Sequence, residues 1–382
     1  MTLQELMTRW NGYQIEMRRW FHQHPEESTK EVRTAERIRA ELDRAGIPWR
    51  PCGLGTGTLA RIEGAQPGRT ILLRGDIDAR SVNEETGLPY ASEVPGVMHA
   101  CGHDGHTAIE LGLAEETARM IRAGEKLPRN VLFVFQPAEE TTGGAGRICE
   151  TGVFEKYRVT RIFGLHLWPN LPEGSVWSRP GPMMARSNEV TLKVTGRSVH
   201  VSRAAEGLDA LRAGVDWMNA AYAWTEALPP DVLRTLQFGR MTAGTVRNAV
   251  AGSAEIQGTL RTYDEDAAEM IRSHLRTLAA ETAERTGCGL EVSFSTGYPA
   301  VWNNETLCER VSRDLGADAP QLLAEPVLAA EDFSFYQRCI PGVFFFLGVG
   351  PAHELHSPHF CWNDEAVIPA GIAFMKKIMV LP

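Results

Sequence analysis

Five short polar motifs stand far apart in this 382-residue chain, and four of them begin at or just after the end of an apolar, strand-like run. They read RGDIDA at 74–79, HACGHDGH at 99–106, QPAEE at 136–140, GLHLWP at 164–169 and LHSPHF at 355–360. Open α/β sheets bind their ligands beyond the carboxyl ends of their strands. The pattern therefore predicts an α/β fold in which these motifs share one site.

The first part of the chain alternates helices and strands. Helical spacing covers residues 3–22 and 29–46, and a further helix is expected near 107–123. Strand-like runs occur at TLARIEG, TILLRGDID, NVLFVFQ and RIFGLHL. This order predicts an open mixed sheet with helices on both faces. We expect residues 1–186 and 297–382 to form this domain.

The pattern changes near Asn188. A strand NEVTLKVTG is followed by a long helical segment, two strands (LRTLQFGRMTAG and SAEIQGTLRTY), a second helix over 264–285 and the strand LEVSFS. This βαββαβ order is that of a ferredoxin-like unit. It predicts an inserted domain of residues 187–296.

Composition excludes several classes of protein. The chain has 39 basic and 48 acidic residues, a formal charge of −9, and no Lys/Arg run that would favour nucleic acid. Its first residues have helical spacing rather than the pattern of a signal peptide, and no apolar run reaches membrane-spanning length. Seven scattered cysteines indicate free thiols in a reducing compartment. We therefore expect a cytoplasmic protein that binds neither nucleic acid nor membranes.

Side chains of several motifs are good metal ligands. Cys101 and His103 lie two residues apart, Glu140 follows 37 residues after His103, His166 follows another 26 residues on, and His356 comes from the far end of the chain. Thiolate, imidazole and carboxylate together suit zinc, manganese, cobalt or nickel. An isolated His is usually a surface or hydrogen-bonded residue, and an isolated buried Cys is usually a small hydrophobic core residue. The combination, however, predicts a metal site.

These segments resemble the M20 peptidase and amidohydrolase family, in particular its N-acyl-amino-acid, hippurate and auxin-conjugate amidohydrolases. The resemblance covers nearly the whole chain, from RRWFHQHPE at 18–26 to LHSPHF, and its most specific motifs are HACGHDGH and PAEE. It implies a lid role for the inserted domain, assembly as a homodimer or higher homo-oligomer, and two divalent metal ions per chain. The ligands that it implies are Cys101, His103, Glu140, His166 and His356.

Adjacent Glu139 and Glu140 are expected to have different roles. Successive side chains point in different directions in a helix or a strand, so one carboxylate can bind metal while the other reaches the attacking water. The resemblance assigns the catalytic base to Glu139. The pair could instead be an acidic helix N-terminus.

Three aspartates are candidates for supporting the ligands. Asp76 and Asp78 follow a strand that reads as buried, where a carboxylate can orient a ligating imidazole through its second ring nitrogen. They could instead cap the loop, because Asp is a favoured turn residue. Asp104, next to His103, is a comparable supporting candidate.

The resemblance also assigns roles within the inserted domain. His200 matches a histidine that supports the tetrahedral oxyanion, often from the partner subunit of a dimer. Asn248 and Arg261 match segments that hold the substrate's carboxylate, a task that suits a planar guanidinium. Without the resemblance, His200 and Arg261 would be interpreted as ordinary surface residues.

Two departures from the subgroup's pattern concern substrate choice. Arg80 and Ser81 stand where the subgroup commonly has Leu-Pro, and Ser202 and Arg203 follow His200 in place of the more common Pro-His pair. We expect neither departure to touch a metal ligand.

The sequence thus predicts a metal-dependent amidohydrolase that cleaves N-acyl-amino acids, or related small amides, to a carboxylic acid and an amino acid. One alternative is a metallo-exopeptidase acting on dipeptides. Another is an amidase with Cys101 as nucleophile beside His103 or His106, which leaves PAEE and LHSPHF unexplained. A non-catalytic metal-binding protein is the third, and it has no need of Glu139. The motifs leave open the acyl group, the amino acid and the metal.

Overall fold

The computed structural model describes residues 3–66 and 68–381, which form two compact units. One unit comprises Met1–Met183, Trp302–Glu325 and Asp332–Pro382, and the other comprises Met184–Val301 and Pro326–Glu331. The second unit is therefore largely an insertion between two parts of the first. Among the described residues, no helix is both long and apolar enough to cross a membrane.

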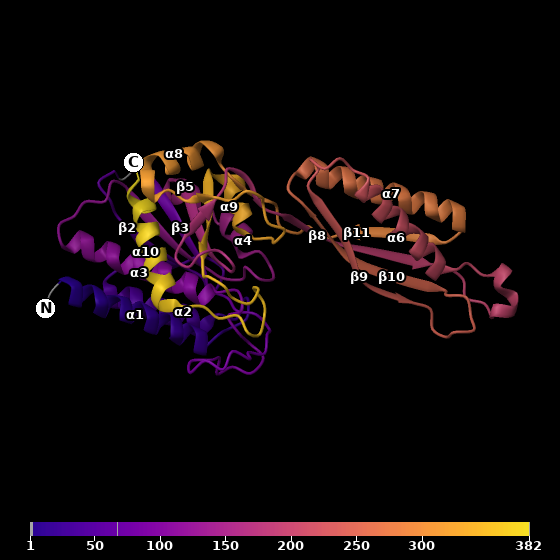
Figure 1. The fold of residues 1–382 in the computed structure, drawn as a ribbon, viewed down its shortest axis with the longest axis horizontal. Coiled ribbons are helices and arrows are strands. Elements are labelled where there is room, and N and C mark those ends of the chain that lie inside the picture. The colour runs from indigo at the N-terminus through magenta and orange to yellow at the C-terminus, as the bar shows by residue number, and fades with distance from the viewer. Residues whose placement is uncertain (1–2, 67, 382) are drawn as a thin grey trace. The chain divides into compact units, whose positions relative to one another are not determined.

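The first unit is built on a mixed eight-stranded sheet (Figure 1). In spatial order its strands are β1 (Trp49–Pro51), β2 (Thr58–Ile62), β4 (Asn130–Gln136), β3 (Thr70–Asp76), β5 (Val159–Trp168), β14 (Gly342–Gly348), β6 (Val176–Ser178) and β13 (Gln321–Leu322). The four central strands β4, β3, β5 and β14 run parallel, whereas β2 and β6 are antiparallel to their central neighbours. The predicted open mixed sheet is confirmed.

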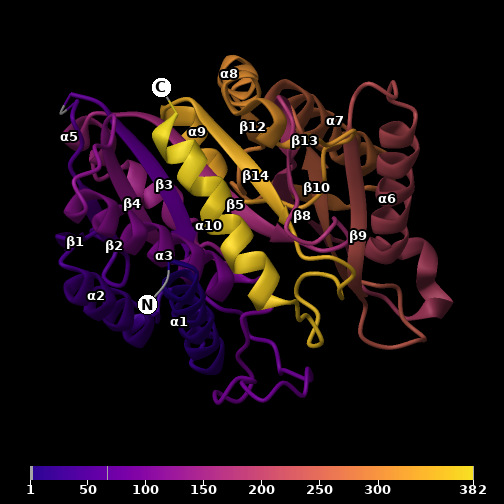
Figure 2. The same ribbon diagram turned by 60° about the vertical axis from the view of Figure 1, so that its left-hand side comes forward.

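Helices cover both faces of this sheet, as predicted (Figure 2). One face packs against α1 (Leu3–Gln23), α2 (Val32–Ala45), α3 (His103–Arg122), α8 (Glu305–Leu315) and α10 (Asp364–Val380). The other face packs against α4 (Gly144–Cys149), α5 (Val153–Tyr157) and α9 (Phe333–Cys339). On this second face, the ring of Phe333 lies 4.7 Å from that of Phe344 in β14.

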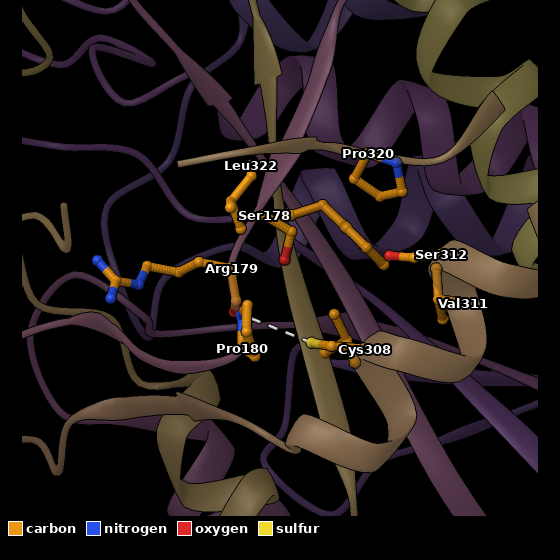
Figure 3. A pocket seen from close by; sticks show the side chains of 10 residues that line it. Ser178, Arg179, Pro180, Cys308, Val311, Ser312, Pro320 and Leu322 are labelled. Atoms are coloured by element: carbon orange, nitrogen blue, oxygen red, sulfur yellow. Dashed lines mark hydrogen bonds between the residues drawn. The ribbon is translucent and has the colours of Figure 1, made fainter. Parts of the chain in front are cut away.

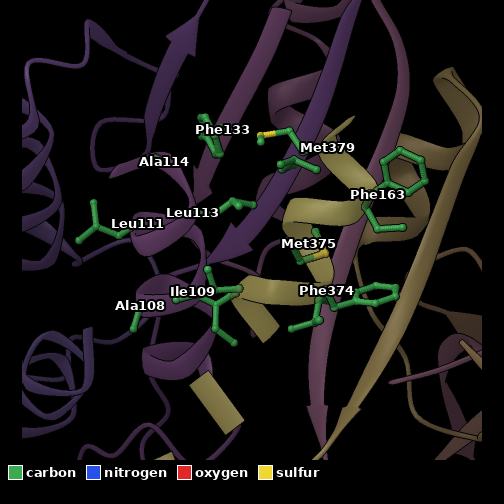
Figure 4. Packing of buried hydrophobic residues seen from close by; sticks show 14 of the residues in the cluster. Ala108, Ile109, Leu111, Leu113, Ala114, Phe133, Phe163, Phe374, Met375 and Met379 are labelled. Carbon is green, nitrogen blue, oxygen red and sulfur yellow. The ribbon is translucent and has the colours of Figure 1, made fainter. Parts of the chain in front are cut away.

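The central strands are buried on both faces, which explains why their sequences read as continuous apolar runs. Between the sheet and helices α3 and α10 lies a dense core (Figure 4). In it Phe345 stacks on Phe163 with ring centres 6.2 Å apart and meets Phe374 of α10 edge-on at 4.9 Å. This packing fixes the strands whose ends carry the polar motifs.

The register of the parallel strands brings those ends together. Gly75 in β3 pairs with Phe135 in β4, and Arg74 pairs with Gly164 in β5. The polar residues that follow β3 and β4 and those near the end of β5 therefore leave the sheet at the same edge. The topology places the motifs where α/β folds bind ligands.

The second unit has the βαββαβ order predicted for the inserted domain. Its elements are β8 (Arg186–Thr195), α6 (Ala210–Glu226), β9 (Arg234–Ala243), β10 (Ser253–Thr262), α7 (Glu265–Thr286) and β11 (Gly289–Phe294). The strands form an antiparallel sheet in the order β11-β8-β10-β9, and α6 and α7 pack on one face of it (Figure 1). Trp217 of α6 is fully buried in the hydrophobic core of this second unit.

The remaining elements are short. They are β7 (Gly181–Met184), which pairs with β12 (Val301–Asn303), and the 3-10 helices η1 (Val201–Glu206) and η2 (Gly316–Asp318).

A cavity of about 250 Å³ lies between α8 and strands β6, β13 and β14 (Figure 3). Cys308 of α8 lines it and places its Sγ 3.9 Å from the main-chain oxygen of Arg179. Its walls are mostly apolar, with Val311, Leu322 and Phe345 among them. None of the residues that line it belongs to the five motifs.

Candidate metal centre

The five predicted ligands converge at one edge of the first unit's sheet. Sγ of Cys101 lies 3.5 Å from Nε2 of His166 and 3.3 Å from Nε2 of His356. Oε1 of Glu140 lies 3.6 Å from Nε2 of His356 and 4.0 Å from Nε2 of His103. Segments separated by up to 255 residues thus direct sulfur, nitrogen and oxygen atoms toward a common point.

Close backbone packing allows the start of α3 to reach this point. Gly102 precedes the helix in the left-handed region, at φ 85°, and a Cβ there would lie 3.0 Å from Leu167 of β5. At Gly105 a Cβ would come within 2.7 Å of both Leu167 and Trp362. The two glycines therefore let Cys101 and His103 approach the end of β5.

Hydrogen bonds fix two of the imidazoles in the form that binds metal. Nδ1 of His103 donates to the main-chain oxygen of Asp78 at 2.9 Å, and Nδ1 of His166 donates to that of Leu167 at 2.6 Å. This leaves the Nε2 lone pairs directed at the cluster. Within the described part of the chain, Nε2 of His103 and Oε1 of Glu140 are buried without a hydrogen-bond partner. Such orphaned acceptors fit a bound cation.

The electrostatic environment of His166 and His356 agrees with this assignment. Burial lowers the pKa of His166 well below its ordinary value and that of His356 to about 4, so both imidazoles are neutral at physiological pH, as ligands must be. Burial raises the pKa of the Cys101 thiol and of the Glu140 carboxyl. A bound cation reverses that effect and holds a ligating thiol in its thiolate form. The donor set therefore fits divalent transition metals.

Glu139 lies beside the cluster and is buried. One carboxylate oxygen of Glu139 lies within 4.8 Å of ligand atoms of both His103 and Glu140, and Oε1 accepts a hydrogen bond from the N–H of Asp332 at 3.4 Å. Ala138, directly before it, has a φ of 60°, a conformation that residues with a Cβ rarely adopt. The N–H of Ala138 donates to the buried Glu31 carboxylate at 2.9 Å, which holds this strained residue in place.

The candidate supporting residues Asp76 and Asp78 both contact ligands or the residues that orient them. Oδ2 of Asp78 accepts hydrogen bonds from Oγ of Ser28 at 2.6 Å and from the N–H of Glu140 at 3.0 Å. Asp76 accepts from Arg74 at 2.7 Å and from Nδ1 of His106 at 2.6 Å. These contacts fix the backbone and imidazoles of the site.

Asp104 faces away from the cluster, toward α1. It accepts hydrogen bonds from Nδ1 of His22 at 2.7 Å and lies 3.0 Å from Nε of Arg18. Although burial opposes ionisation, Arg18 and His22 hold the pKa of Asp104 well below its usual range. Its support for the ligands is therefore indirect, through the anchoring of α3 to α1.

Arg80 corrects one expectation. Its Nη1 donates to Oε2 of Glu140, so the first departure from the subgroup's pattern does touch a predicted metal ligand. Sequence analysis also overlooked His22, His106 and Glu31 as parts of the site's framework. His22 lies in RRWFHQHPE and His106 in HACGHDGH, which were the available signals, but nothing in the sequence identifies the partners of these side chains.

Three predicted residues lie in the second unit. Nδ1 of the exposed His200 accepts from the N–H of Ser202 at 3.3 Å, and the N–H of Val201 donates to the main-chain oxygen of Asn248 at 3.0 Å, so His200 and Asn248 share one corner. Arg261 lies on β10, where Nη1 contacts Thr259 and burial lowers its pKa.

Comparisons with known proteins match this chain to one family over most of its length. A model of peptidase family M20/M25/M40 matches residues 72–380. The N-acetylcysteine deacetylase of Bacillus subtilis is 34% identical over 371 residues, or 96% of each chain. An N-acetyldiaminopimelate deacetylase of Pediococcus pentosaceus is 34% identical over 388 residues, or 96% of this chain and 97% of the relative. The Bacillus subtilis YXEP protein, a dinuclear metal binding peptidase from the M20 family, matches with a TM-score of 0.85 and 33% identity over 98% of both chains.

Proposed function

Because this chain belongs to peptidase family M20/M25/M40 and is an amidohydrolase, we propose that it cleaves N-acyl-amino acids, or closely related small amides, to a carboxylic acid and an amino acid. The observation that carries the proposal is the convergence of five ligand side chains with an additional buried carboxylate, Glu139, beside them. A protein that only binds metal has no use for such a base.

Two divalent ions, zinc, manganese, cobalt or nickel, would be held by Cys101, His103, Glu140, His166 and His356. When bound, they polarise the amide carbonyl and lower the pKa of a water molecule. Asp78 holds the backbone of Glu140, and the main-chain oxygens of Asp78 and Leu167 hold the imidazoles of His103 and His166. These three proposed ligands are therefore oriented before any ion arrives.

Glu139 performs the proton transfers. Its carboxylate takes a proton from the attacking water as the water oxygen bonds to the carbonyl carbon, and it then gives a proton to the leaving nitrogen as the C–N bond breaks. The strained Ala138 and the N–H of Asp332 fix the position of Glu139 during both steps. The reaction therefore needs no covalent link to the protein.

The second unit completes the site in this proposal. Because Nδ1 of His200 accepts a hydrogen bond, its Nε2 carries the hydrogen and can donate to the oxygen of the tetrahedral intermediate. Arg261 and Asn248 hold the substrate's α-carboxylate. We further propose that the chain forms a homodimer in which His200 serves the partner's site. All seven cysteines are free thiols, which supports a cytoplasmic location.

A nucleophilic role for Cys101 fits the structure poorly. Its sulfur lies among the imidazoles of His166 and His356, and burial raises its pKa, whereas a reactive cysteine has a lowered pKa. Resistance to chelators combined with inactivation by an alkylating agent would favour that alternative.

A substrate panel tests the proposal. The purified protein, loaded separately with each of the four metals, is assayed on N-acetyl- and N-benzoyl-amino acids and on dipeptides with a free α-amino group. We expect hydrolysis of the N-acyl compounds. Preferential hydrolysis of free dipeptides would instead identify a metallo-exopeptidase, and no hydrolysis of either class by metal-loaded protein would contradict both functions.

A further inference from the structure

We call the side of the candidate metal centre that carries His356 and Arg80 its open side. The side chains of His103 and Glu140 are 1% and 7% exposed, whereas those of His356 and Arg80 are 45% and 34% exposed. Arg80 and His356 both contact the carboxylate of Glu140. A substrate that approaches the ligands from this open side must therefore pass a guanidinium.

Arg80 is held firmly in this position. Its N–H donates to the main-chain oxygen of Met98 at 3.0 Å, and the N–H of Met98 donates back to the main-chain oxygen of Arg80 at 3.0 Å. The guanidinium bonds Oε2 of Glu140, while Oε1 of the same carboxylate faces His103 and His356. The two oxygens of Glu140 are thus divided between Arg80 and the metal ligands.

The charge of Arg80 remains available in the loaded enzyme. A carboxylate that binds a divalent cation shares its negative charge with that cation, so Glu140 can neutralise Arg80 only in part. A guanidinium carries five N–H donors in a planar fork that matches a carboxylate. Arg80 uses Nη1 for Glu140 and is partly exposed, so it has further donors for a substrate.

We propose that Arg80 is a specificity-determining residue that binds a second carboxylate of the substrate, distinct from the α-carboxylate assigned to Arg261 and Asn248. The preferred substrates are then dianionic N-acyl-amino acids. This inference rests on the proposed amide hydrolysis. The second carboxylate belongs either to the acyl group or to the side chain of the amino acid.

Two pairs of substrates that differ only in a carboxylate or a carboxamide separate these sources. One pair is N-glutarylalanine and its terminal amide, and the other is N-acetylglutamate and N-acetylglutamine. A hydrogen bond to a charged group contributes about 1.5–3 kcal/mol, which corresponds to a preference of roughly 10- to 100-fold in kcat/KM for the carboxylate in one pair. The pair that shows the preference identifies whether the second carboxylate belongs to the acyl group or to the side chain of the amino acid.

Variants of the full-length, metal-loaded enzyme test the role of Arg80. Arg80→Met should abolish the preference, and Arg80→Lys should keep part of it because the charge remains. Arg313→Met is the matched control, since Arg313 is 72% exposed on α8 and should keep the wild-type ratio. Elemental analysis checks that Arg80→Met retains its metals.

Equilibrium binding of glutarate, compared with its monoamide, provides a readout that does not depend on turnover. Wild-type enzyme should bind glutarate more tightly, and Arg80→Met should bind both alike. Equal kcat/KM within both wild-type pairs, or a preference that survives Arg80→Met, overturns the proposal. The proposal is also overturned if Arg80→Met changes only the recognition of the substrate's α-carboxylate. It is overturned as well if Arg80→Met loses metal while its binding of glutarate is unchanged. If no amide is hydrolysed, the hydrolase proposal fails, but glutarate binding still decides the role of Arg80.

Discussion

The N–H of Leu167 donates to Nε2 of His106 over 2.9 Å. Because Nε2 is the acceptor, Nδ1 of His106 carries the hydrogen and donates it to Asp76 at 2.6 Å. The main-chain oxygen of Leu167 accepts from Nδ1 of the neighbouring His166 at 2.6 Å. The aspartate at the end of β3 is thereby connected to the orientation of a predicted metal ligand on β5, and His106 has no lone pair left for a metal.

The first prediction is that His106→Gln weakens metal binding by about 10- to 100-fold, the usual cost of removing a partner that orients a ligand. The loss follows from the freed N–H of Leu167 and the altered position of His166. Competition with a chelating dye measures it, and His359→Gln serves as control because His359 is exposed and bonds to Glu85. Unchanged affinity in His106→Gln would contradict this role.

The roles of the two adjacent glutamates give the second prediction. Glu139→Gln should retain its metals but lose about 10²- to 10⁴-fold in kcat, because a positioned proton-transfer group is removed. Glu140→Gln should lose metal occupancy, since a carboxamide is a weaker ligand for a divalent cation. Metal content and kcat are measured on both proteins. Equal loss of metal from the two variants would show that the roles are misassigned.

Metal removal gives the third prediction. Active protein should contain two divalent ions per chain, lose its amidase activity on chelation, and regain it when zinc, manganese, cobalt or nickel is restored. The reason is that no protein side chain replaces the polarisation of the carbonyl that the ions supply. Elemental analysis before and after chelation is the measurement. Active protein free of transition metal would rule out the two-metal site.

The sequence predicted which candidate ligands come together better than it predicted their surroundings. The resemblance implied the five candidate ligands, and their positions in motifs at or near strand ends predicted that they share one site. Arg80 could not be placed in this way, because its contact with Glu140 depends on how two loops 60 residues apart pack against each other. Asp104 faces α1 because successive helical residues point about 100° apart, which turns it away when His103 faces the cluster.

The fourth prediction concerns pH. Burial raises the pKa of Glu110 on α3 from 4.5 to about 8. Between these values the native protein holds a proton that the unfolded chain has lost, so the free energy of unfolding falls as the pH rises through this window. Glu110→Gln cannot ionise and should be more stable than wild type above pH 8, by up to a few kcal/mol.

Denaturant unfolding of metal-saturated protein from pH 5 to pH 9 measures this difference. Glu125→Gln is the matched control, because Glu125 is exposed just beyond the end of α3. Wild type and the control should share the same decline in stability with pH, whereas Glu110→Gln should show less of it. Parallel curves for all three proteins would mean that Glu110 is ionised in the native state.

The last prediction tests whether His200 serves the partner's site. Removal of an oxyanion donor typically costs about 10²- to 10³-fold in kcat, so His200→Ala and Glu139→Gln should each be nearly inactive. In a mixed dimer, one site combines an intact Glu139 with the partner's intact His200. After random subunit exchange about a quarter of the wild-type activity should return, because half of the dimers are mixed and one site in each is whole. Activity is measured after exchange has been verified with labelled chains. No recovery despite complete exchange, or full activity of a monomer, would place His200 within its own chain's site or outside catalysis.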